Sequence, residues 1–481
     1  METKIYVTTT IPYVNARPHI GFALELIQAD VIARYHRLLG IKTRFQTGTD
    51  ENALKNVLAA REAGLSEIEL VNKNSGLFKD LEDKMDTSAN VFLRTTEERH
   101  SRAVNHFWSH MRPDDIYLRT YSGLYCNGCE DFYLEKDLIG GKCPDHGTKP
   151  VYVDEINYFF RLSAYQERLE DLIGKDRIKI IPNTRKNEIV EFIKRGLNDI
   201  SISRSARRFN GWGIYVTNDH SQVVYVWIDA LINYLSGLGY GEEEDWSEFW
   251  NNDTLKVHII GKNVWKFHAV YWPAILLSAG LALPNKIFIH GFLTENGKKI
   301  SKSSGVSIDP VTYIEKYGVD SVRYYLLRAI SPFEDGDFSS ERLEQLHNSD
   351  LANNLGNLLN RITTLCQKAE YGCFNPPNTR SAPDGYHDAI TSFEYDKALK
   401  ILWSNLSLIN RDIDGTQPWR SLKSGNSQQL KKDLTRWLNE LYIVGYWLAP
   451  FLPETSKKIM NVLLETPIST GFPLFPRLDQ A

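Results

Sequence analysis

The sequence lacks the features that mark secreted, disulfide-rich and membrane-spanning proteins. It contains five cysteines in 481 residues, and three of them lie close together between residues 126 and 143. This distribution fits a reducing cytosol better than a disulfide framework. No basic segment leads into an apolar run near the N-terminus, so we expect no secretion signal. The longest apolar stretch, Ala269–Leu283, is interrupted by Trp272 and Pro273 and is too short to span a bilayer. We therefore expect a cytoplasmic protein with no membrane partner.

The sequence also lacks a strong charge imbalance and a dinucleotide-binding glycine motif. The formal net charge is −4, which does not by itself predict a nucleic-acid partner. Basic clusters at residues 204–208 and 431–436 can still supply local phosphate contacts. Without the Gly-x-Gly-x-x-Gly pattern, a nicotinamide-dependent enzyme is not supported. The chain is longer than chains that usually fold around one hydrophobic core, so its length predicts two or three domains.

The N-terminal pattern predicts an α/β fold with a parallel sheet. A strand beginning at Ile5 is followed by a helix over His19–Leu39, which Gly40 ends, and then by a strand over Thr43–Thr47. Alternation of this kind favours parallel strands covered by helices.

Two short motifs, almost three hundred residues apart, suit phosphate binding. Pro18-His19-Ile20-Gly21 opens a long helix, whose first-turn N–H groups can face an anion. Lys299-Ile300-Ser301-Lys302-Ser303 follows an apolar strand and an Asn-Gly turn, which predicts a loop with two lysines and two hydroxyls beside a hairpin. Taken singly, His19 is typical of a helix cap and the lysine-serine loop of a solvated surface. Together they predict a triphosphate site.

These motifs resemble the His-Ile-Gly-His and Lys-Met-Ser-Lys-Ser signatures of class I aminoacyl-tRNA synthetases. Further stretches, running from Tyr6 to beyond Trp419, resemble the methionyl-tRNA synthetase family. They include Pro-Tyr-Val-Asn at 12–15, Gly-Thr-Asp-Glu at 48–51, Tyr-Val-Trp-Ile-Asp-Ala-Leu at 225–231 and Phe-His-Ala-Val-Tyr-Trp-Pro at 267–273. The resemblance implies a methionine–tRNA ligase, which makes methionyl-adenylate from L-methionine and ATP with Mg²⁺ and transfers it to methionine tRNA.

The resemblance also implies an α/β fold, in which a Rossmann-like class I synthetase catalytic domain carries a zinc-bearing connective insertion and precedes a C-terminal α-helical anticodon-binding bundle. The strand and helix patterns change at matching places. The expected segments are the first half of the catalytic domain at 1–113, the insertion with a zinc knuckle at 114–222, the second half with the lysine-serine loop at 223–325, a connecting segment at 326–347 and the bundle at 348–481. We expect a monomer, because no appended C-terminal domain follows the bundle.

In this family, the two motifs bind ATP. The resemblance implies that His19 steadies the α-phosphate while the carboxylate of methionine attacks, and that Lys302 stabilises the pentavalent transition state, with Lys299 beside it. Such catalysis depends on positioning and charge neutralisation. The expected ATP-binding residues are Pro18, His19, Gly21, Phe22, Gly261, Asn263, Lys299, Ser301 and Lys302.

The expected methionine pocket depends more on the resemblance, because the aromatic residues alone are equally typical of a core. Aromatic faces suit a polarizable thioether. Asp50 is expected to bind the α-ammonium group and Arg204 to pair with Asp50 and orient it, with an ordinary ion pair as the alternative. The expected methionine-binding residues are Ile11, Tyr13, Asp50, Arg204, Trp227, Ala230, Tyr234, His268 and Trp272.

The cysteine cluster predicts one structural zinc ion. Cys126-x-x-Cys129 and Cys143-x-x-His146 supply two ligand pairs on tight turns, as a closed tetrahedral site requires. A metal-free knuckle is the alternative. The resemblance implies a site without a catalytic water.

Three residues of the C-terminal half suit an unpaired base. Asn357 and Arg361 are four residues apart and share a helix face, away from an apolar stripe of Leu351, Leu355, Leu358 and Ile362. Alone, that face is a solvated helix surface. Trp419 matches the tryptophan of the family that stacks an anticodon base, so the resemblance implies recognition of a CAU anticodon.

Three positions near the nucleotide depart from the family pattern. Phe22 and Asn52 stand where histidines are usual, and Asn263 stands where an aspartate binds the ribose. We expect Phe22 and Asn52 to form one coordinated change. These departures keep a second function open, a tRNA- or methionine-binding synthetase paralogue with weak or no adenylation. A ligase for leucine, isoleucine or valine is disfavoured, because the insertion is too short for the editing domain of those enzymes.

Overall fold

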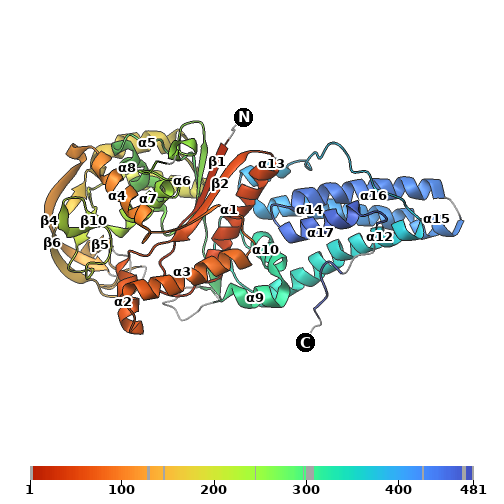
Figure 1. Cartoon of the computed structure of the whole chain (residues 1–481), viewed down its shortest axis with the longest axis horizontal. Coiled ribbons are helices and arrows are strands. Elements are labelled where there is room, and N and C mark those ends of the chain that lie inside the picture. The colour runs from red at the N-terminus through yellow and green to blue at the C-terminus, as the bar shows by residue number, and fades with distance from the viewer. Residues whose placement is uncertain are drawn as a thin grey trace.

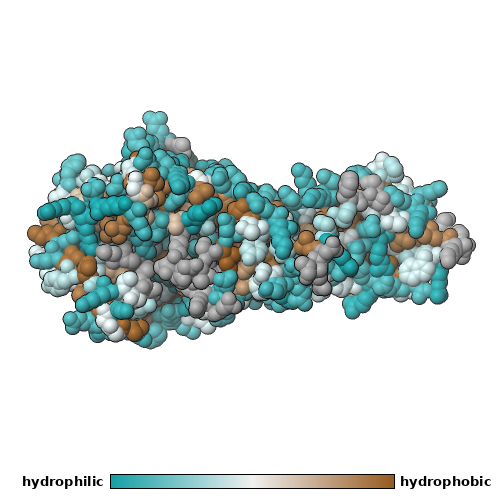
Figure 2. Space-filling view, turned by 90° about the horizontal axis from the view of Figure 1, so that it is seen from below, coloured by the Kyte–Doolittle hydropathy of each residue, from teal (hydrophilic) through white to brown (hydrophobic). Residues whose placement is uncertain are grey.

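The computed structural model describes residues 4–126, 131–144, 147–243, 245–295, 297–299, 308–424, 427–468 and 473–478. An α/β body lies at one end of an elongated molecule and a helical bundle at the other (Figure 1). Hydrophilic residues cover most of the face in Figure 2, with apolar groups scattered among them. Within the described residues, no helix is long and apolar enough to cross a membrane.

A six-stranded parallel sheet forms the centre of the α/β body. The strand order is β3-β2-β1-β12-β13-β7. Every residue of β12 and most of β1 are buried, as expected for parallel strands covered on both faces. The bounds are β1 Lys4–Thr9, β2 Lys42–Thr49, β3 Val91–Arg94, β7 Lys179–Ile181, β12 Leu255–Gly261 and β13 Lys286–His290.

The chain leaves β1 toward β2 on one side, while β12 pairs with β1 on the other. In open α/β sheets, ligands bind at such a switch point, beyond the carboxyl ends of the strands. Thr9 and Gly261, the last residues of β1 and β12, therefore mark the edge of the sheet where the site is expected.

Helices cover both faces of this sheet. The predicted opening strand, long helix and second strand are confirmed as β1, α1 and β2. The helix α1 buries an apolar face against the sheet and ends before Gly40, whose φ is 77°. The helices of this part are α1 Ile20–Leu38, α2 Leu54–Ala63, α3 Glu67–Lys84, α4 Glu98–His110, α7 Val226–Ser236, α8 Trp272–Ser278 and a π-helix, Phe267–Tyr271.

The segment at 114–222 is only partly a separate insertion. Its long hairpin, β4 with β6, belongs to a four-stranded sheet in the order β5-β4-β6-β8, and a second small sheet has the order β10-β11-β9. However, β7 returns to the central sheet and pairs with β13, so part of the segment expected as an insertion belongs to the α/β body. The bounds are β4 Ile116–Cys126, β5 Asp131–Tyr133, β6 Val151–Phe160, α5 Gln166–Gly174, α6 Asn183–Lys194, β8 Ile200–Ser201, β9 Ser203–Ser205, β10 Tyr215–Val216 and β11 Asp219–Val224.

Beyond β13 a small sheet leads into the helical part. The strand β14 pairs with β15 and with β16. Residues 347–356 are π-helical and run directly into α12. The bounds are β14 Leu293–Glu295, β15 Lys298–Lys299, α9 Pro310–Tyr317, α10 Val319–Arg328, β16 Gly336–Asp337, α11 Ser340–Leu346, α12 Asn357–Lys368, α13 Tyr386–Thr391, α14 Tyr395–Thr416, α15 Pro418–Ser424, α16 Ser427–Leu448 and α17 Pro453–Leu464.

One buried arginine joins the α/β body to the bundle. Arg323 on α10 is fully buried and donates to Asp30 Oδ2 on α1 at 2.7 Å. It also donates to the carbonyl oxygens of Phe451 at 2.8 Å and Pro450 at 3.2 Å, between α16 and α17. The helix that begins at the predicted phosphate motif is therefore fixed to the bundle by a satisfied ion pair.

Candidate functional site

The start of α1 is built to face an anion. His19 is its N-cap, and the Nδ1 atom of the ring accepts a hydrogen bond from the Gly21 N–H at 3.1 Å. This bond places the proton of a neutral ring on Nε2. A Cβ atom on residue 21 would lie 2.9 Å from His19 Cε1, so glycine is needed for this geometry. No acidic residue occupies the first turn, which leaves the positive end of the helix dipole uncompensated by its own side chains.

A buried polar cluster ties three elements together beside this helix. Glu25 on α1 accepts from the Thr10 N–H at 2.7 Å, and its other oxygen lies 2.9 Å from His290 Nε2 at the end of β13. His290 pairs in register with Gly261. Glu25 was not predicted from the sequence, although a carboxylate inside the apolar run Phe-Ala-Leu-Glu-Leu-Ile is a signal that could have identified it.

Gly261 and Asn263 lie together at the end of β12. A Cβ atom on residue 261 would lie 3.1 Å from Asn263 Oδ1, so the amide lies over the glycine. The Asn263 side chain is exposed. Its amide oxygen can accept a ribose hydroxyl, as expected, but without the charge of an aspartate.

Two aspartates hold the hairpin that leads to the lysine-serine loop. Asp337 Oδ1 accepts from the Thr294 hydroxyl at 2.7 Å and from the Gly297 N–H at 3.1 Å. Asp335 accepts from Lys262 Nζ at 2.7 Å and from the Phe292 N–H at 2.9 Å. Partial burial favours a higher pKa for Asp335, but these two hydrogen bonds outweigh it and lower the pKa. Neither aspartate was predicted from the sequence to support this hairpin.

The two lysines predicted to be catalytic are only partly within the described structure. The backbone of Lys299 belongs to β15, which pairs with β14. Ser301 and Lys302 lie outside the described residues, so their predicted contacts to ATP stay predictions. The structure places the start of their loop on a hairpin that β16 supports.

Aromatic side chains from three elements meet at the predicted methionine pocket. The Trp227 and Phe267 rings stack with centroids 3.8 Å apart and planes 5° apart, and the Tyr13 and Trp227 centroids are 5.9 Å apart. Tyr13 forms an isolated parallel bridge with Asp50, so the expected ammonium ligand lies beside the aromatic cluster. Ala230, on α7 between Trp227 and Tyr234, is buried.

Tyr234 and His268 form the polar part of this cluster. The Tyr234 hydroxyl lies 2.8 Å from His268 Nε2, and His268 Nδ1 lies 3.0 Å from the Val264 carbonyl oxygen. Because that carbonyl only accepts, the ring carries its proton on Nδ1. Burial lowers the pKa of His268 to about 4, so Nε2 accepts from Tyr234 at neutral pH. Burial likewise raises the pKa of Tyr234.

Trp272 lies behind this polar pair and is fully buried. Its indole N–H donates to His258 Nε2 at 3.2 Å, and its ring centroid lies 6.0 Å from that of Tyr234. Tyr234, His268 and Trp272, which together form the wall of this cluster, are each at most 3% exposed.

The turn that follows β2 is clamped on both sides of Asp50. The Glu51 carboxylate accepts hydrogen bonds from Arg94 Nε at 2.7 Å and from Arg94 Nη2 at 3.0 Å. Asn52 Nδ2 donates to Asp229 Oδ2 at 2.8 Å, and Asp229 Oδ1 lies 2.6 Å from the Nε2 atom of His100. Arg94, His100 and Asp229 were missed as supports of the turn. Their contacts fix the backbone that carries Asp50.

Phe22 and Asn52 have different neighbours. Phe22 is 8% exposed and packs edge-to-face on Phe78 of α3, with ring centroids 5.1 Å apart. Asn52 bonds to α7 and to the Thr95 carbonyl. These contacts do not support the expectation of one coordinated change at the two positions.

Arg204, on β9, is buried and lies against the rings of Tyr125 and Tyr225. Its Nη1 atom donates to the Ser203 carbonyl at 2.8 Å and to the Ser201 hydroxyl at 2.9 Å. Its guanidinium lies 3.8 Å from the Tyr225 ring centroid. The predicted pairing of Arg204 with Asp50 stays a prediction.

Two of the four predicted metal ligands are described. Cys126 ends β4 and Cys143 follows β5, and both are buried. Thr148 joins them, because its carbonyl accepts from the Cys143 N–H at 2.9 Å and its hydroxyl lies 3.8 Å from Cys126 Sγ. Cys129 and His146 lie outside the described residues. Within the described residues, no group of three candidate ligands occurs, and the two pairs therefore stay a prediction.

The three predicted anticodon-binding residues lie at the bundle surface. Arg361 Nη2 donates to Asp414 Oδ1 at 2.6 Å, and Asn357 on the preceding turn is exposed. Gln417, with φ of 50°, ends α14 and directs the chain into α15, where Trp419 is 44% exposed. The predicted stripe is confirmed, since all four of its members are fully buried: Leu351, Leu355, Leu358 and Ile362.

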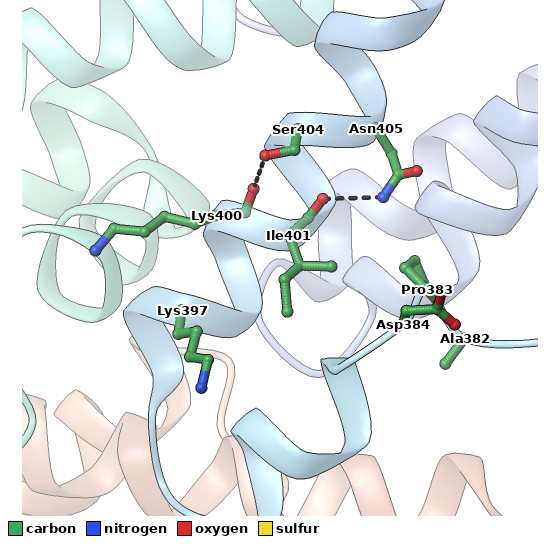
Figure 3. Close-up of a pocket in the computed structure, with 8 residues that line it drawn as sticks. All are labelled: Ala382, Pro383, Asp384, Lys397, Lys400, Ile401, Ser404 and Asn405. Atoms are coloured by element: carbon green, nitrogen blue, oxygen red, sulfur yellow. Dashed lines mark hydrogen bonds between the residues drawn. The ribbon is translucent and has the colours of Figure 1, made fainter.

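A surface hollow of about 520 Å³ lies away from all these residues, between α14 and the loop before α13 (Figure 3). Ala382, Pro383 and Asp384 form one side of it. Lys397 pairs with Glu394, the N-cap of α14, and Lys400 pairs with Asp396 on α14, so neither lysine of the hollow is unpaired. The lining from α14 consists of Lys397, Lys400, Ile401, Ser404 and Asn405.

Known proteins are similar to this chain over most of its length. Residues 5–156 and 135–363 match the family described as tRNA synthetases class I (M). The methionine–tRNA ligase of Thermotoga maritima is 40% identical over 476 residues, which cover 95% of this chain and 75% of that protein. The corresponding ligase of Brucella suis is 38% identical, over 99% of this chain and 98% of that protein.

Solved structures agree with the sequence comparison. Mycobacterium tuberculosis methionyl-tRNA synthetase in complex with methionyl-adenylate has a TM-score of 0.89 and 37% identity, over 97% of this chain and 94% of that one. Its free form has a TM-score of 0.86 and 33% identity, over 100% of this chain and 99% of that one. This chain therefore belongs to the methionine–tRNA ligase family of class I aminoacyl-tRNA synthetases.

Proposed function

We propose that this chain activates L-methionine with ATP and Mg²⁺ and transfers it from methionyl-adenylate to methionine tRNA. The observation that carries the proposal is the meeting of the His19-capped helix, the Asp50 turn and the aromatic cluster at one edge of the sheet. A relative with this fold holds methionyl-adenylate.

In this mechanism, the carboxylate of methionine attacks the α-phosphate of ATP and diphosphate leaves. The His19 Nε2–H and the first-turn N–H groups of α1 stabilise the charge that develops on the phosphate. Gly261 and Asn263 receive the ribose, while Pro18 and Gly21 shape the approach to the phosphates. Lys299, Ser301 and Lys302 are the expected contacts of the triphosphate, and Mg²⁺ bound with the ATP substrate would neutralise part of its charge.

The amino acid is held by charge at one end and by aromatic faces at the other. The Asp50 carboxylate pairs with the α-ammonium group, and the clamped turn reduces the reorganisation needed on binding. Ile11, Tyr13 and Trp227 enclose the thioether with Ala230, Tyr234, His268 and Trp272. Such a wall favours a polarizable, uncharged side chain.

We also propose one structural zinc ion, held by Cys126, Cys129, Cys143 and His146. The two described thiols fit this site, because Thr148 brings their segments together and both are buried without a disulfide. The metal would supply four bonds that hold the knuckle together, and no chemical step depends on it.

Recognition of the tRNA is assigned to the bundle. The exposed Trp419 ring offers a stacking face for a base of the CAU anticodon, and Asn357 and Arg361 offer donors for its edge. The pairing of Arg361 with Asp414 holds the guanidinium in place before binding. A monomer in the cytoplasm is the expected form.

The test is methionine-dependent ATP–diphosphate exchange, followed by charging of a tRNA with a CAU anticodon. His19→Gln should abolish most of the exchange, whereas His110→Gln, an exposed histidine on α4, should leave it intact. The departures Phe22 and Asn263 favour one alternative, a paralogue that binds methionine and tRNA without useful adenylation. Methionine binding without any exchange by the wild-type chain would support that alternative.

A further inference from the structure

The histidine that accepts the Trp272 indole N–H lies directly behind Tyr234 and Trp272. His258 is on β12, is fully buried, and pairs in register with Thr8 of β1. Its ring stacks on Tyr234 with centroids 4.3 Å apart and planes 30° apart. Its Nε2 atom receives the Trp272 indole N–H at 3.2 Å.

These contacts determine the protonation of the ring. An indole N–H only donates, so His258 Nε2 must be unprotonated. The single ring proton therefore lies on Nδ1 and donates to the Thr8 hydroxyl oxygen at 2.6 Å. Burial lowers the pKa of His258 well below its usual value, with the nearby His268 and Lys256 acting in the same direction.

His258 thus contacts two wall residues in different ways. A hydrogen bond sets the plane of the Trp272 indole, and ring stacking sets the plane of Tyr234. Tyr234 in turn directs its hydroxyl proton toward His268 Nε2. The donors of Trp272 and Tyr234 thus both lie against imidazole nitrogens, and the Tyr234 hydroxyl also lies 3.2 Å from the Thr9 carbonyl oxygen.

We propose that His258 is a positioning residue for the methionine pocket, acting as a neutral acceptor that fixes Trp272 and Tyr234 without touching the substrate. This inference rests on the proposed methionine site. It assigns to β12, besides the nucleotide contacts at its end, a role in selecting an apolar thioether side chain.

The first test measures the ring itself in the full-length chain. Nitrogen-15 NMR of histidine-labelled protein distinguishes a protonated Nδ1 from a protonated Nε2, and His258→Gln identifies the resonance by its loss. The expected state has the proton on Nδ1 at neutral pH. An imidazolium, or a proton on Nε2, would overturn the proposal.

The second test separates positioning from folding. His258→Phe keeps a ring for stacking but leaves the Trp272 N–H without its acceptor. The methionine KM should therefore rise about tenfold with little change in kcat. His258→Gln, whose amide oxygen can accept, should recover part of this loss. In Trp272→Phe, which has no indole N–H, His258→Phe should cost less than it does alone.

His347→Phe is the matched control. His347 is also buried and bonded through both ring nitrogens, to Ser321 and to the Pro476 carbonyl, but it lies outside the pocket. His347→Phe should leave the methionine KM unchanged. Equal KM effects from both histidine variants, or equal effects of His258→Phe with and without the indole N–H, would refute positioning. If the wild-type chain shows no exchange, the proposed function fails, whereas the NMR result still decides the state of His258.

Discussion

The departures from the family pattern beside the expected ATP site give the most informative prediction, a double-mutant cycle at Phe22 and Asn52. Phe22→His restores an imidazole donor one residue after Gly21, at the position where the family carries the second histidine of its first signature. A preorganised transition-state donor contributes about 10²–10³ in rate. Here the ring must leave its edge-to-face contact with Phe78, so we expect a gain of only about tenfold in adenylation.

The same change should destabilise the fold. Phe22 is 8% exposed, and replacing a buried aromatic ring by a smaller polar one loses apolar burial and the ring pair. Together these cost about 1–3 kcal/mol in the free energy of unfolding. Phe78→Leu is the matched control, because it removes the same ring pair without adding a donor and should lower stability without raising the rate.

Asn52→His acts on a different set of contacts. It removes the amide donor to the buried Asp229 carboxylate, a bond to a charged group worth about 1.5–3 kcal/mol. The rate of adenylation should not rise. Because Phe22 and Asn52 share no described partner, the effects of the two changes should add within about 0.5 kcal/mol.

Rapid-quench measurement of methionyl-adenylate in a single turnover, for both single mutants and the double mutant, gives the coupling directly. Urea unfolding of the same proteins separates stability from rate. A coupling above about 1 kcal/mol would refute the reasoning and support the coordinated change expected from the sequence.

Three further outcomes are expected. Elemental analysis of chelator-free protein should find one zinc per chain, and Cys143→Ser should lower that content; protein without stoichiometric metal would contradict the assignment. Trp419→Ala should weaken use of methionine tRNA by about 1–3 kcal/mol and leave adenylate formation unchanged, whereas equal damage to both would indicate a structural role. Although burial opposes it, the Arg323 and Arg34 charges and the Ser88 hydroxyl hold the pKa of Asp30 below its ordinary value. Stability from Asp30 is therefore present above the unfolded pKa of about 4 and lost as pH falls through the folded pKa. The free energy of unfolding of Asp30→Asn should be lower at neutral pH and should lack this loss as the pH falls. An unchanged pH dependence in acid unfolding would contradict the prediction.

The candidate site residues could be named from the sequence, because local chemistry signals them. The His19 cap requires only a glycine two residues later and the start of a helix. Trp419 follows a proline after a long helix, and its exposure agrees with its expected role. The supporting residues carry no such signal. Glu25, His100 and His258 act on partners 265, 129 and 14 residues away in sequence, across elements that meet only in the folded chain.

The sequence by itself determined the alternation of strands and helices, the two phosphate motifs and the buried stripe at the start of the bundle, since each depends on residues close together in the chain. Only the tertiary structure decided the rest. It placed β7 in the central sheet, gave Phe22 and Asn52 separate partners, and joined α1 to the bundle through Arg323. It also set the protonation of His258, because a buried imidazole takes its tautomer from the donors and acceptors around it. Those neighbours come from β1 and from the start of α8, which only packing brings together.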